Sequence, residues 1–119
     1  MSKMIFIVDD TDSILALTAS VLEDDYPVLT MPGADRMFTL LTKKQPDLIL
    51  LDIEMPGMTG YEAIAILKEN PEWQDIPVIF LTGFIDQDVT DRCMGSGALA
   101  VFSKSDIETS LLDRIKEFI

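Results

Sequence analysis

The stretch Leu48-Ile49-Leu50-Leu51-Asp52 joins an unbroken apolar run to a carboxylate, and three other segments of the chain follow a similar pattern. Residues 5–8 (IFIV) stop at Asp9 and Asp10, residues 78–81 (VIFL) stop at Thr82, and residues 98–102 (ALAVF) run through Ser103 into Lys104. Continuous apolar runs of this length are typical of strands buried on both faces, as in a parallel sheet. In such a sheet all strands end at one edge, where open α/β folds bind their ligands.

The segments between these runs have helical patterns. The first expected helix is capped by Thr11 or Asp12 and has an apolar stripe of Ile14, Leu17, Val21 and Leu22, and the second covers residues 35–44. The third begins with a capping box of Thr59 and Glu62 and ends at Asn70-Pro71, and the fourth covers residues 86–94. The fifth begins with a capping box of Ser105 and Glu108 and has an apolar stripe of Ile107, Leu111, Ile115 and Phe118. Residues 28–31 form a less apolar strand, expected at a sheet edge. Five strands alternating with five helices predict a doubly wound α/β sheet in one domain over residues 1–119.

Composition narrows the classes of function. The net charge of −12 argues against direct binding of nucleic acid or anionic membranes. No apolar stretch is long enough to span a membrane, no secretory signal is evident, and the single Cys93 fits a reducing cytosol, so we expect a cytoplasmic location. The chain has no histidine, which excludes a Ser-His-Asp triad, a histidine base and a histidine-ligated metal.

The polar residues at the predicted strand ends suggest a specific chemistry. The pattern leaves the strand order open, but it suggests that the strands before Asp9-Asp10 and before Asp52 are neighbours, about 4.8 Å apart. Three crowded carboxylates suit a hard cation such as Mg²⁺. An ionised aspartate can also act as a nucleophile toward phosphorus. Thr82 and Lys104 would supply a hydroxyl and a cation for the phosphoryl oxygens.

Five motifs carry a resemblance to a known family: Val8-Asp9-Asp10, residues 52–60 (DIEMPGMTG), residues 76–83 (IPVIFLTG), Gly97-Ala98 and Lys104. In this order and over essentially the whole chain, they resemble the receiver domain of two-component response regulators. The resemblance implies a flavodoxin-like sheet of order 2-1-3-4-5. It also implies a signalling module rather than a general enzyme, one that catalyses only its own phosphoryl transfer and the hydrolysis of its aspartyl phosphate.

The resemblance also implies roles for individual residues. Asp52 accepts a phosphoryl group from a sensor histidine kinase or a histidine phosphotransfer protein. Asp10 and Asp52 bind Mg²⁺ directly, Asp9 partly through water, and the Glu54 backbone carbonyl completes the set. Thr82 and Lys104 hold the phosphoryl oxygens, the Glu54 and Phe84 side chains flank them, and Thr82 and Phe102 form the switch. A downstream protein, an effector domain or a second copy is expected to bind the fourth helix, last strand and fifth helix.

Two positions depart from the family pattern. Ser105 follows Lys104 where the family usually has a proline after a cis peptide bond. A cis bond to a non-proline residue costs about 2.5–4 kcal/mol, which favours a trans bond and leaves the approach angle of the lysine open. Phe102 has no hydroxyl, so a switch at this position would work through apolar packing.

Three other functions compete with a phosphorylated signalling module. A receiver-like interaction domain that is never phosphorylated is disfavoured by the intact acidic set. A phosphatase with Glu54 as acid/base is disfavoured by Met55-Pro56 and by the lack of a large insertion. A flavodoxin-like cofactor carrier is disfavoured because acidic residues, not a phosphate loop, follow the first strand. The kinase, the output, and whether the chain acts alone or within a longer protein stay open.

Overall fold

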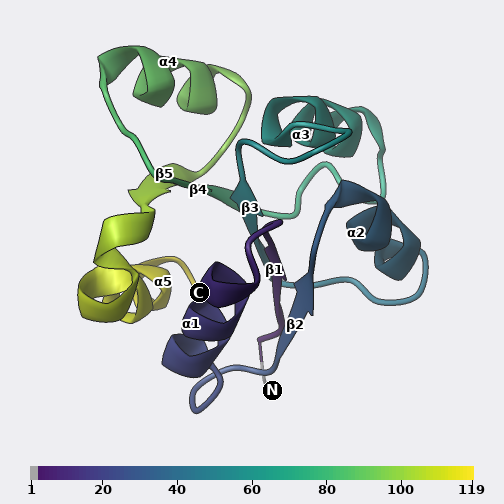
Figure 1. Ribbon diagram of the computed structural model, residues 1–119. Coiled ribbons are helices and arrows are strands. Elements are labelled where there is room, and N and C mark those ends of the chain that lie inside the picture. The colour runs from purple at the N-terminus through teal and green to yellow at the C-terminus, as the bar shows by residue number, and fades with distance from the viewer. Residues whose placement is uncertain (1–2) are drawn as a thin grey trace.

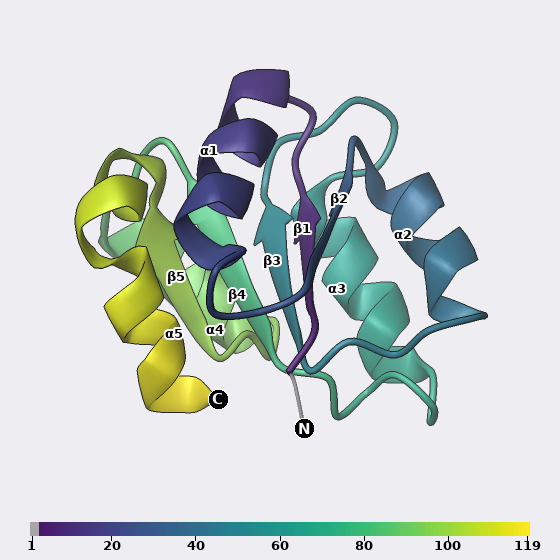
Figure 2. The same cartoon turned by 90° about the horizontal axis from the view of Figure 1, so that it is seen from below.

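The computed structural model describes residues 3–119 and shows a parallel five-stranded sheet between two layers of helices (Figure 1). The strands are β1 (Ile5–Val8), β2 (Val28–Met31), β3 (Leu48–Asp52), β4 (Val78–Thr82) and β5 (Ala100–Ser103). Their order is β2-β1-β3-β4-β5, so β2 and β5 are the edge strands (Figure 2). The order implied by the family resemblance is confirmed, and so is the pairing of the two strands that precede the acidic residues.

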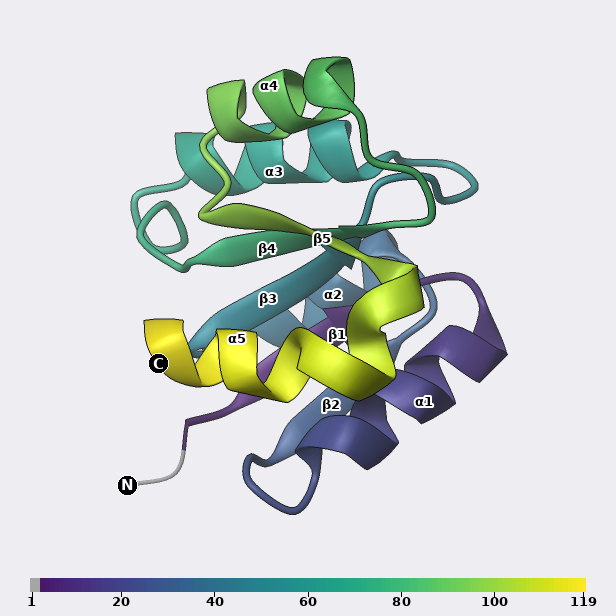
Figure 3. The same cartoon turned by 90° about the vertical axis from the view of Figure 1, so that its left-hand side faces the viewer.

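The helices divide between the two faces of the sheet. On one face lie α1 (Asp12–Leu22) and α5 (Leu112–Phe118); on the other lie α2 (Ala34–Leu41), α3 (Gly60–Glu69) and α4 (Gln87–Gly95) (Figure 3). Successive residues of a strand point to opposite faces, so Ile5 and Ile7 pack under α1 and α5, and Phe6 and Val8 pack under α2 and α3. This two-sided burial explains why the central strands are apolar throughout.

The edge position of β2 is visible in its burial. Only Met31 is buried, Val28 and Leu29 are half-buried, and Thr30 is exposed, whereas all residues of β1 and β3 are buried. The lower apolarity of residues 28–31 therefore predicted the edge correctly.

The predicted apolar stripe of α1 packs against the core, but three of its four residues are not the most buried ones of the helix. Leu22 is buried as expected, but the other buried residues are Leu15 and Thr18, while Ile14, Leu17 and Val21 are only half-buried. The most buried face of α1 is therefore centred on the row Leu15, Thr18 and Leu22, next to the predicted row. Thr18 tolerates burial because its hydroxyl donates to the Ile14 carbonyl at 2.7 Å.

The start of the fifth helix also differs from the prediction. Ser105 and Glu108 form no capping box; the Ser103 hydroxyl accepts from the Ser105 N–H at the start of a 3-10 turn, Lys104–Asp106. One turn of π-helix, Ile107–Leu111, leads into α5. The buried positions Ile107, Leu111 and Ile115 are as predicted, and Phe118 is half-buried. The predicted capping box of Thr59 and Glu62 is present at α3.

Within residues 3–119, none of the helices has the length and apolarity needed to cross a bilayer.

Candidate functional site

Three carboxylates meet at the carboxyl edge of the sheet, as the sequence predicted. Asp9 and Asp10 follow β1, Asp52 ends β3, and these strands are paired in register. Each of the three side chains offers an oxygen, and these oxygens lie within 4.8 Å of one another. Asp9 and Asp52 are buried, with 0% and 3% exposure, whereas Asp10 faces solvent.

Asp9 is a fully buried acid with one incompletely satisfied oxygen. Its Oδ1 accepts from the Thr11 backbone N–H at 2.8 Å, which ties the β1–α1 turn to the site. Its Oδ2 lies 2.8 Å from Lys104 Nζ, an ion pair without hydrogen-bond geometry. The negative charge of the buried Asp9 is therefore balanced directly by the Lys104 ammonium.

Lys104 crosses from the end of β5 to the acidic cluster. Its ammonium lies 3.0 Å from Asp52 Oδ1 and 2.8 Å from Asp9 Oδ2. Residues 3–119 contain no cis peptide bond, so the Lys104–Ser105 bond is trans, and the lysine nevertheless reaches both carboxylates. Burial alone would lower the pKa of Lys104, but the two paired carboxylates outweigh burial and raise it. The side chain is therefore a fixed cation at neutral pH.

Asp52 is a carboxyl group in a buried environment that disfavours its charged form. Burial raises its pKa from 3.8 to about 6, the hydrogen bond from Lys104 opposes this rise, and the negative charge of Asp9 adds to it. A carboxylate that is partly desolvated and ionised at neutral pH is a competent nucleophile.

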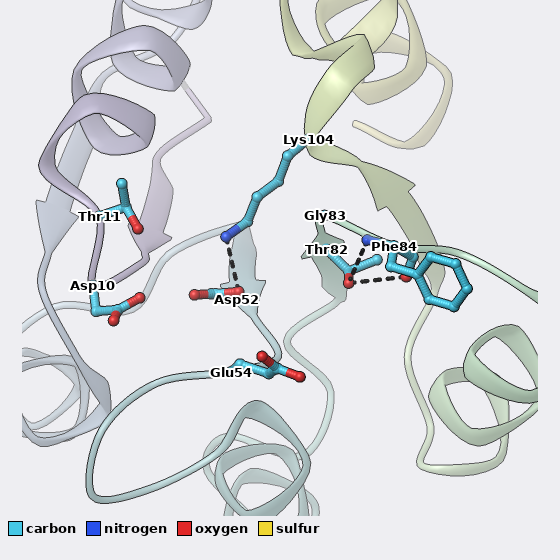
Figure 4. A pocket seen from close by; sticks show the side chains of 8 residues that line it. All are labelled: Asp10, Thr11, Asp52, Glu54, Thr82, Gly83, Phe84 and Lys104. Atoms are coloured by element: carbon cyan, nitrogen blue, oxygen red, sulfur yellow. Dashed lines mark hydrogen bonds and ion pairs between the residues drawn. The ribbon is translucent and has the colours of Figure 1, made fainter.

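A cavity of about 410 Å³ opens in front of Asp52 (Figure 4). It is lined by Asp10, Thr11, Asp52, Glu54, Thr82, Gly83, Phe84 and Lys104. The structure thus brings Thr82, Lys104 and Glu54 to the acidic cluster, as predicted. The close-up shows the Thr82 hydroxyl turned toward its own loop: it donates to the Phe84 carbonyl at 3.1 Å and accepts from the Phe84 N–H at 3.3 Å.

Thr11 is a lining residue that sequence reasoning assigned only to helix capping. Its side chain makes no capping hydrogen bond and instead borders the cavity. The available signal was its place immediately after Asp10 at a strand end. Phe84 also borders the cavity; it is 66% exposed, and its ring points away from Asp52 and Lys104 (Figure 4).

Gly60 holds the loop that carries Asp52 and Glu54. Its N–H donates to the Ile53 carbonyl at 2.7 Å, which packs the start of α3 against the end of β3. A Cβ at this position would overlap the Asp52 carbonyl oxygen and would lie 2.9 Å from Phe80 Cε1. The glycine at the end of the 52–60 motif is therefore required for close backbone approach.

Phe102 lies away from the cavity. It is half-buried on β5, packs against the α1 and α5 side of the core, and lines a groove of about 370 Å³ with Val101, Ser110, Asp113, Arg114 and Glu117. Its assignment as a switch residue stays a prediction.

The acidic cluster fits a hard divalent cation. The three oxygens of Asp9, Asp10 and Asp52 are the ligand type that Mg²⁺ and Mn²⁺ accept, they lie within 4.8 Å of one another, and Asp9 Oδ2 lacks a hydrogen bond. The exposed side of the cluster, at Asp10, opens to the cavity, where water could complete the coordination.

Comparison with known proteins agrees with this geometry. Residues 5–116 match the response regulator receiver domain. Sporulation initiation phosphotransferase F of Bacillus subtilis is 31% identical over 120 residues, which cover 100% of this chain and 95% of that protein. Several other curated relatives are longer, and the chain spans only 15% to 26% of their length.

Solved structures show the same fold. Chemotaxis protein CheY4 of Vibrio cholerae has a TM-score of 0.92 at 23% identity, with 100% of both chains covered. The Mn(2+)-bound form of response regulator Rcp1 has a TM-score of 0.78 at 26% identity, covering 97% of this chain and 88% of that one. With the family match, the acidic cluster and the lysine all in agreement, the chain belongs to the response regulator receiver domain family.

Proposed function

We propose that Asp52 accepts a phosphoryl group from a phosphohistidine on a sensor histidine kinase or phosphotransfer protein, and that this modification changes partner binding. The observation that carries the proposal is the convergence of Asp10, Asp52, Lys104 and Thr82 on one cavity, with the buried Asp9 completing the acidic cluster. Residues 1–119 contain no histidine, so the phosphohistidine must lie outside this segment. An Asp52 oxygen would form the new bond to phosphorus, and the P–N bond would break with its electron pair left on the histidine nitrogen.

Asp9, Asp10 and Asp52 would hold Mg²⁺, with the Glu54 backbone carbonyl completing the protein ligands. When bound, the cation would neutralise the carboxylates and coordinate phosphoryl oxygens. The Mn(2+)-bound Rcp1 structure supports a cation in this family, and the oxygen ligands suit Mg²⁺ equally.

Lys104 and Thr82 would bind the remaining phosphoryl oxygens. The Lys104 ammonium is already 3.0 Å from Asp52 Oδ1, so it needs little movement to contact a group attached to Asp52. The Thr82 hydroxyl would have to leave the Phe84 carbonyl to donate to a phosphoryl oxygen. Phosphorylation would therefore release a hydrogen bond that restrains the β4–α4 loop.

The released loop leads directly into α4, which is weakly anchored. Cys93 is the only buried residue of this helix, so little apolar area holds it to the sheet. We propose that the output surface is α4, β5 and α5, including Phe102 and the groove beside it. A downstream protein, an effector domain or a second copy of the chain would bind there. The whole 1–119 segment would act as one receiver unit in the cytoplasm, with no activity beyond formation and hydrolysis of its own aspartyl phosphate.

Intact-mass measurement after incubation with a small phosphodonor and Mg²⁺ tests the proposal. One added phosphoryl group is expected for the wild type and for Asp35→Asn, a matched control at an exposed acid outside the site. Asp52→Asn should gain none. Modification that persists in Asp52→Asn would refute the phosphoacceptor assignment, and no uptake by the wild type would favour the interaction domain that is never phosphorylated.

A further inference from the structure

The turn after β5 places Lys104 without the proline that usually follows this lysine in the family. We propose that the Ser103 hydroxyl is a positioning residue for Lys104: it fixes this turn and thereby aims the ammonium at Asp9 and Asp52. The inference rests on the proposed function for its catalytic consequence, but the geometry of the turn can be tested independently.

The turn is closed by two hydrogen bonds that join Ser103 to Ser105 and thus span Lys104. The Ser105 backbone N–H donates to Ser103 Oγ at 3.2 Å, and the Ser103 and Ser105 hydroxyl oxygens are 2.7 Å apart. A serine hydroxyl that accepts from the N–H two residues later restrains the residue between them in a tight turn. Ser103 itself is extended, with φ −78° and ψ 133°, so the chain changes direction at Lys104.

Regular structure restrains the chain before this turn only up to Ser103, which pairs with Thr82 at the end of the β4–β5 ladder. β5 ends at Ser103, and the segment after it is a short 3-10 turn followed by a π-turn rather than a continuous α-helix. Short 3-10 segments have poor hydrogen-bond geometry and little intrinsic stability. The next buried anchor is Ile107, three residues beyond Lys104. The side-chain hydrogen bond of Ser103 is therefore the local restraint nearest to the lysine.

The ion pairs of Lys104 hold its long side chain in one conformation, and a restraint on the adjacent backbone makes this less costly in entropy. Its side chain is only 18% exposed and its ammonium contacts two acids on other strands, at 2.8 and 3.0 Å. A long flexible side chain loses substantial entropy when it is held in this way. A backbone turn that already directs Lys104 toward the two acids reduces the number of side-chain conformations that are lost when the ion pairs form.

Substitution at Ser103 separates this role from simple packing. Ser103→Val removes the hydroxyl and introduces a β-branched side chain suited to a strand, whereas Ser103→Thr introduces a side chain of nearly the same shape as valine and retains the hydroxyl. Ser105→Ala keeps the N–H donor. Ser20→Ala, which removes a hydroxyl bonded to the Leu17 carbonyl on α1, is the matched control.

Two readouts are needed: the rate of phosphorylation by a small phosphodonor with Mg²⁺, and the NMR order parameter of Lys104 Cε in the unmodified protein. Loss of one hydrogen bond should slow phosphorylation by about two- to ten-fold in Ser103→Val. In Ser103→Val the order parameter of Lys104 Cε should fall and approach that of the exposed Lys43 in the same sample. Ser103→Thr and Ser20→Ala should match the wild type, and Ser105→Ala should show a smaller effect than Ser103→Val.

The two readouts distinguish failure of this inference from failure of the proposed function. An unchanged Lys104 order parameter in Ser103→Val would overturn the positioning role, whatever the rates are. A lower melting temperature with wild-type Lys104 mobility and rate would show that Ser103 is merely structural, and would also overturn it. If the wild type is not phosphorylated but Lys104 loosens in Ser103→Val and not in Ser103→Thr, the positioning role stands and the proposed function fails.

Discussion

Substitution of Gly60 by alanine should destabilise the domain and disturb the site together. A Cβ at Gly60 would overlap the Asp52 carbonyl oxygen and would lie 3.0 Å from the Ile53 Cα and 2.9 Å from Phe80 Cε1. Two of these three neighbours are backbone atoms, which cannot rotate away. The start of α3 must therefore move away from the end of β3, and the N–H of residue 60 would lose its 2.7 Å contact with the Ile53 carbonyl.

The magnitude follows from the cost of overpacking. Forcing one additional carbon into a filled site costs about 1–3 kcal/mol, which for a domain of this size lowers the melting temperature by about 4–12 °C. Gly95→Ala is the matched control because nothing lies within 4 Å of its added carbon. Gly95 is the last residue of α4 and has no positive φ, so alanine there should be neutral or stabilising by up to about 1 kcal/mol.

Thermal unfolding measures the stability difference, and the rate of phosphoryl uptake from a small donor measures the effect on Asp52. Gly60→Ala should also be slower in phosphorylation at a temperature where it remains folded, because the displaced backbone carries Asp52. Equal melting temperatures for Gly60→Ala and Gly95→Ala would refute the reasoning, since both would then have room for the added carbon.

Four other outcomes are expected. Millimolar Mg²⁺ should raise the melting temperature of the wild type, because each tenfold increase in free ion above Kd adds about 1.4 kcal/mol to the free energy of unfolding. An equal rise in Asp10→Ala would argue against the cation site. The raised pKa of Asp52, about 6, means that the native state binds this proton more tightly than the unfolded chain, so its stabilising contribution is complete below pH 3.8 and is lost as pH rises through 6. Urea unfolding in a chelator should show this loss in the wild type and a flatter profile in Asp52→Asn; identical profiles would contradict the shift. Phe84→Ala should lose its phosphoryl group faster than the wild type if the exposed Phe84 side chain, which borders the cavity, closes over a phosphorylated Asp52, and slower loss would contradict such shielding. Hydrogen exchange with a phosphoryl mimic should change across residues 83–105, and changes confined to the acidic cluster would indicate a phosphate relay or sink rather than a conformational switch.

The sheet and the acidic edge could be predicted because they depend on strong, simple signals. Unbroken apolar runs specify strands buried on both faces, and parallel strands bring their ends to one edge regardless of sequence separation. Asp9, Asp52, Thr82 and Lys104 are all strand-end residues, so correct strands placed them together.

The errors arose where two local solutions fit the same residues. Around α1, Ile14 and Leu15 are both apolar, as are Val21 and Leu22, so the helical period fits two adjacent stripes equally and tertiary packing decides between them. After β5, Ser103 and Ser105 can both act as caps; the hydroxyl of Ser103 accepts the N–H, and the helix begins later and irregularly. The local hydrogen bond of Thr82 could not be predicted because it depends on the exact path of the β4–α4 loop.

The charges at the site explain why Lys104 and the proposed divalent cation would act together rather than as alternatives. With Asp52 ionised, three carboxylates and one ammonium leave two negative charges uncompensated, which is the charge that one divalent cation neutralises. Lys104 faces the buried side, at Asp9 and Asp52, while Asp10 opens to solvent and to the cavity. A phosphoryl group on Asp52 would replace one negative charge by about two, so neither cation alone could balance the modified site. Lys104 therefore makes the buried pair of acids tolerable in the absence of metal, and the proposed metal would make the added charge of a phosphoryl group tolerable.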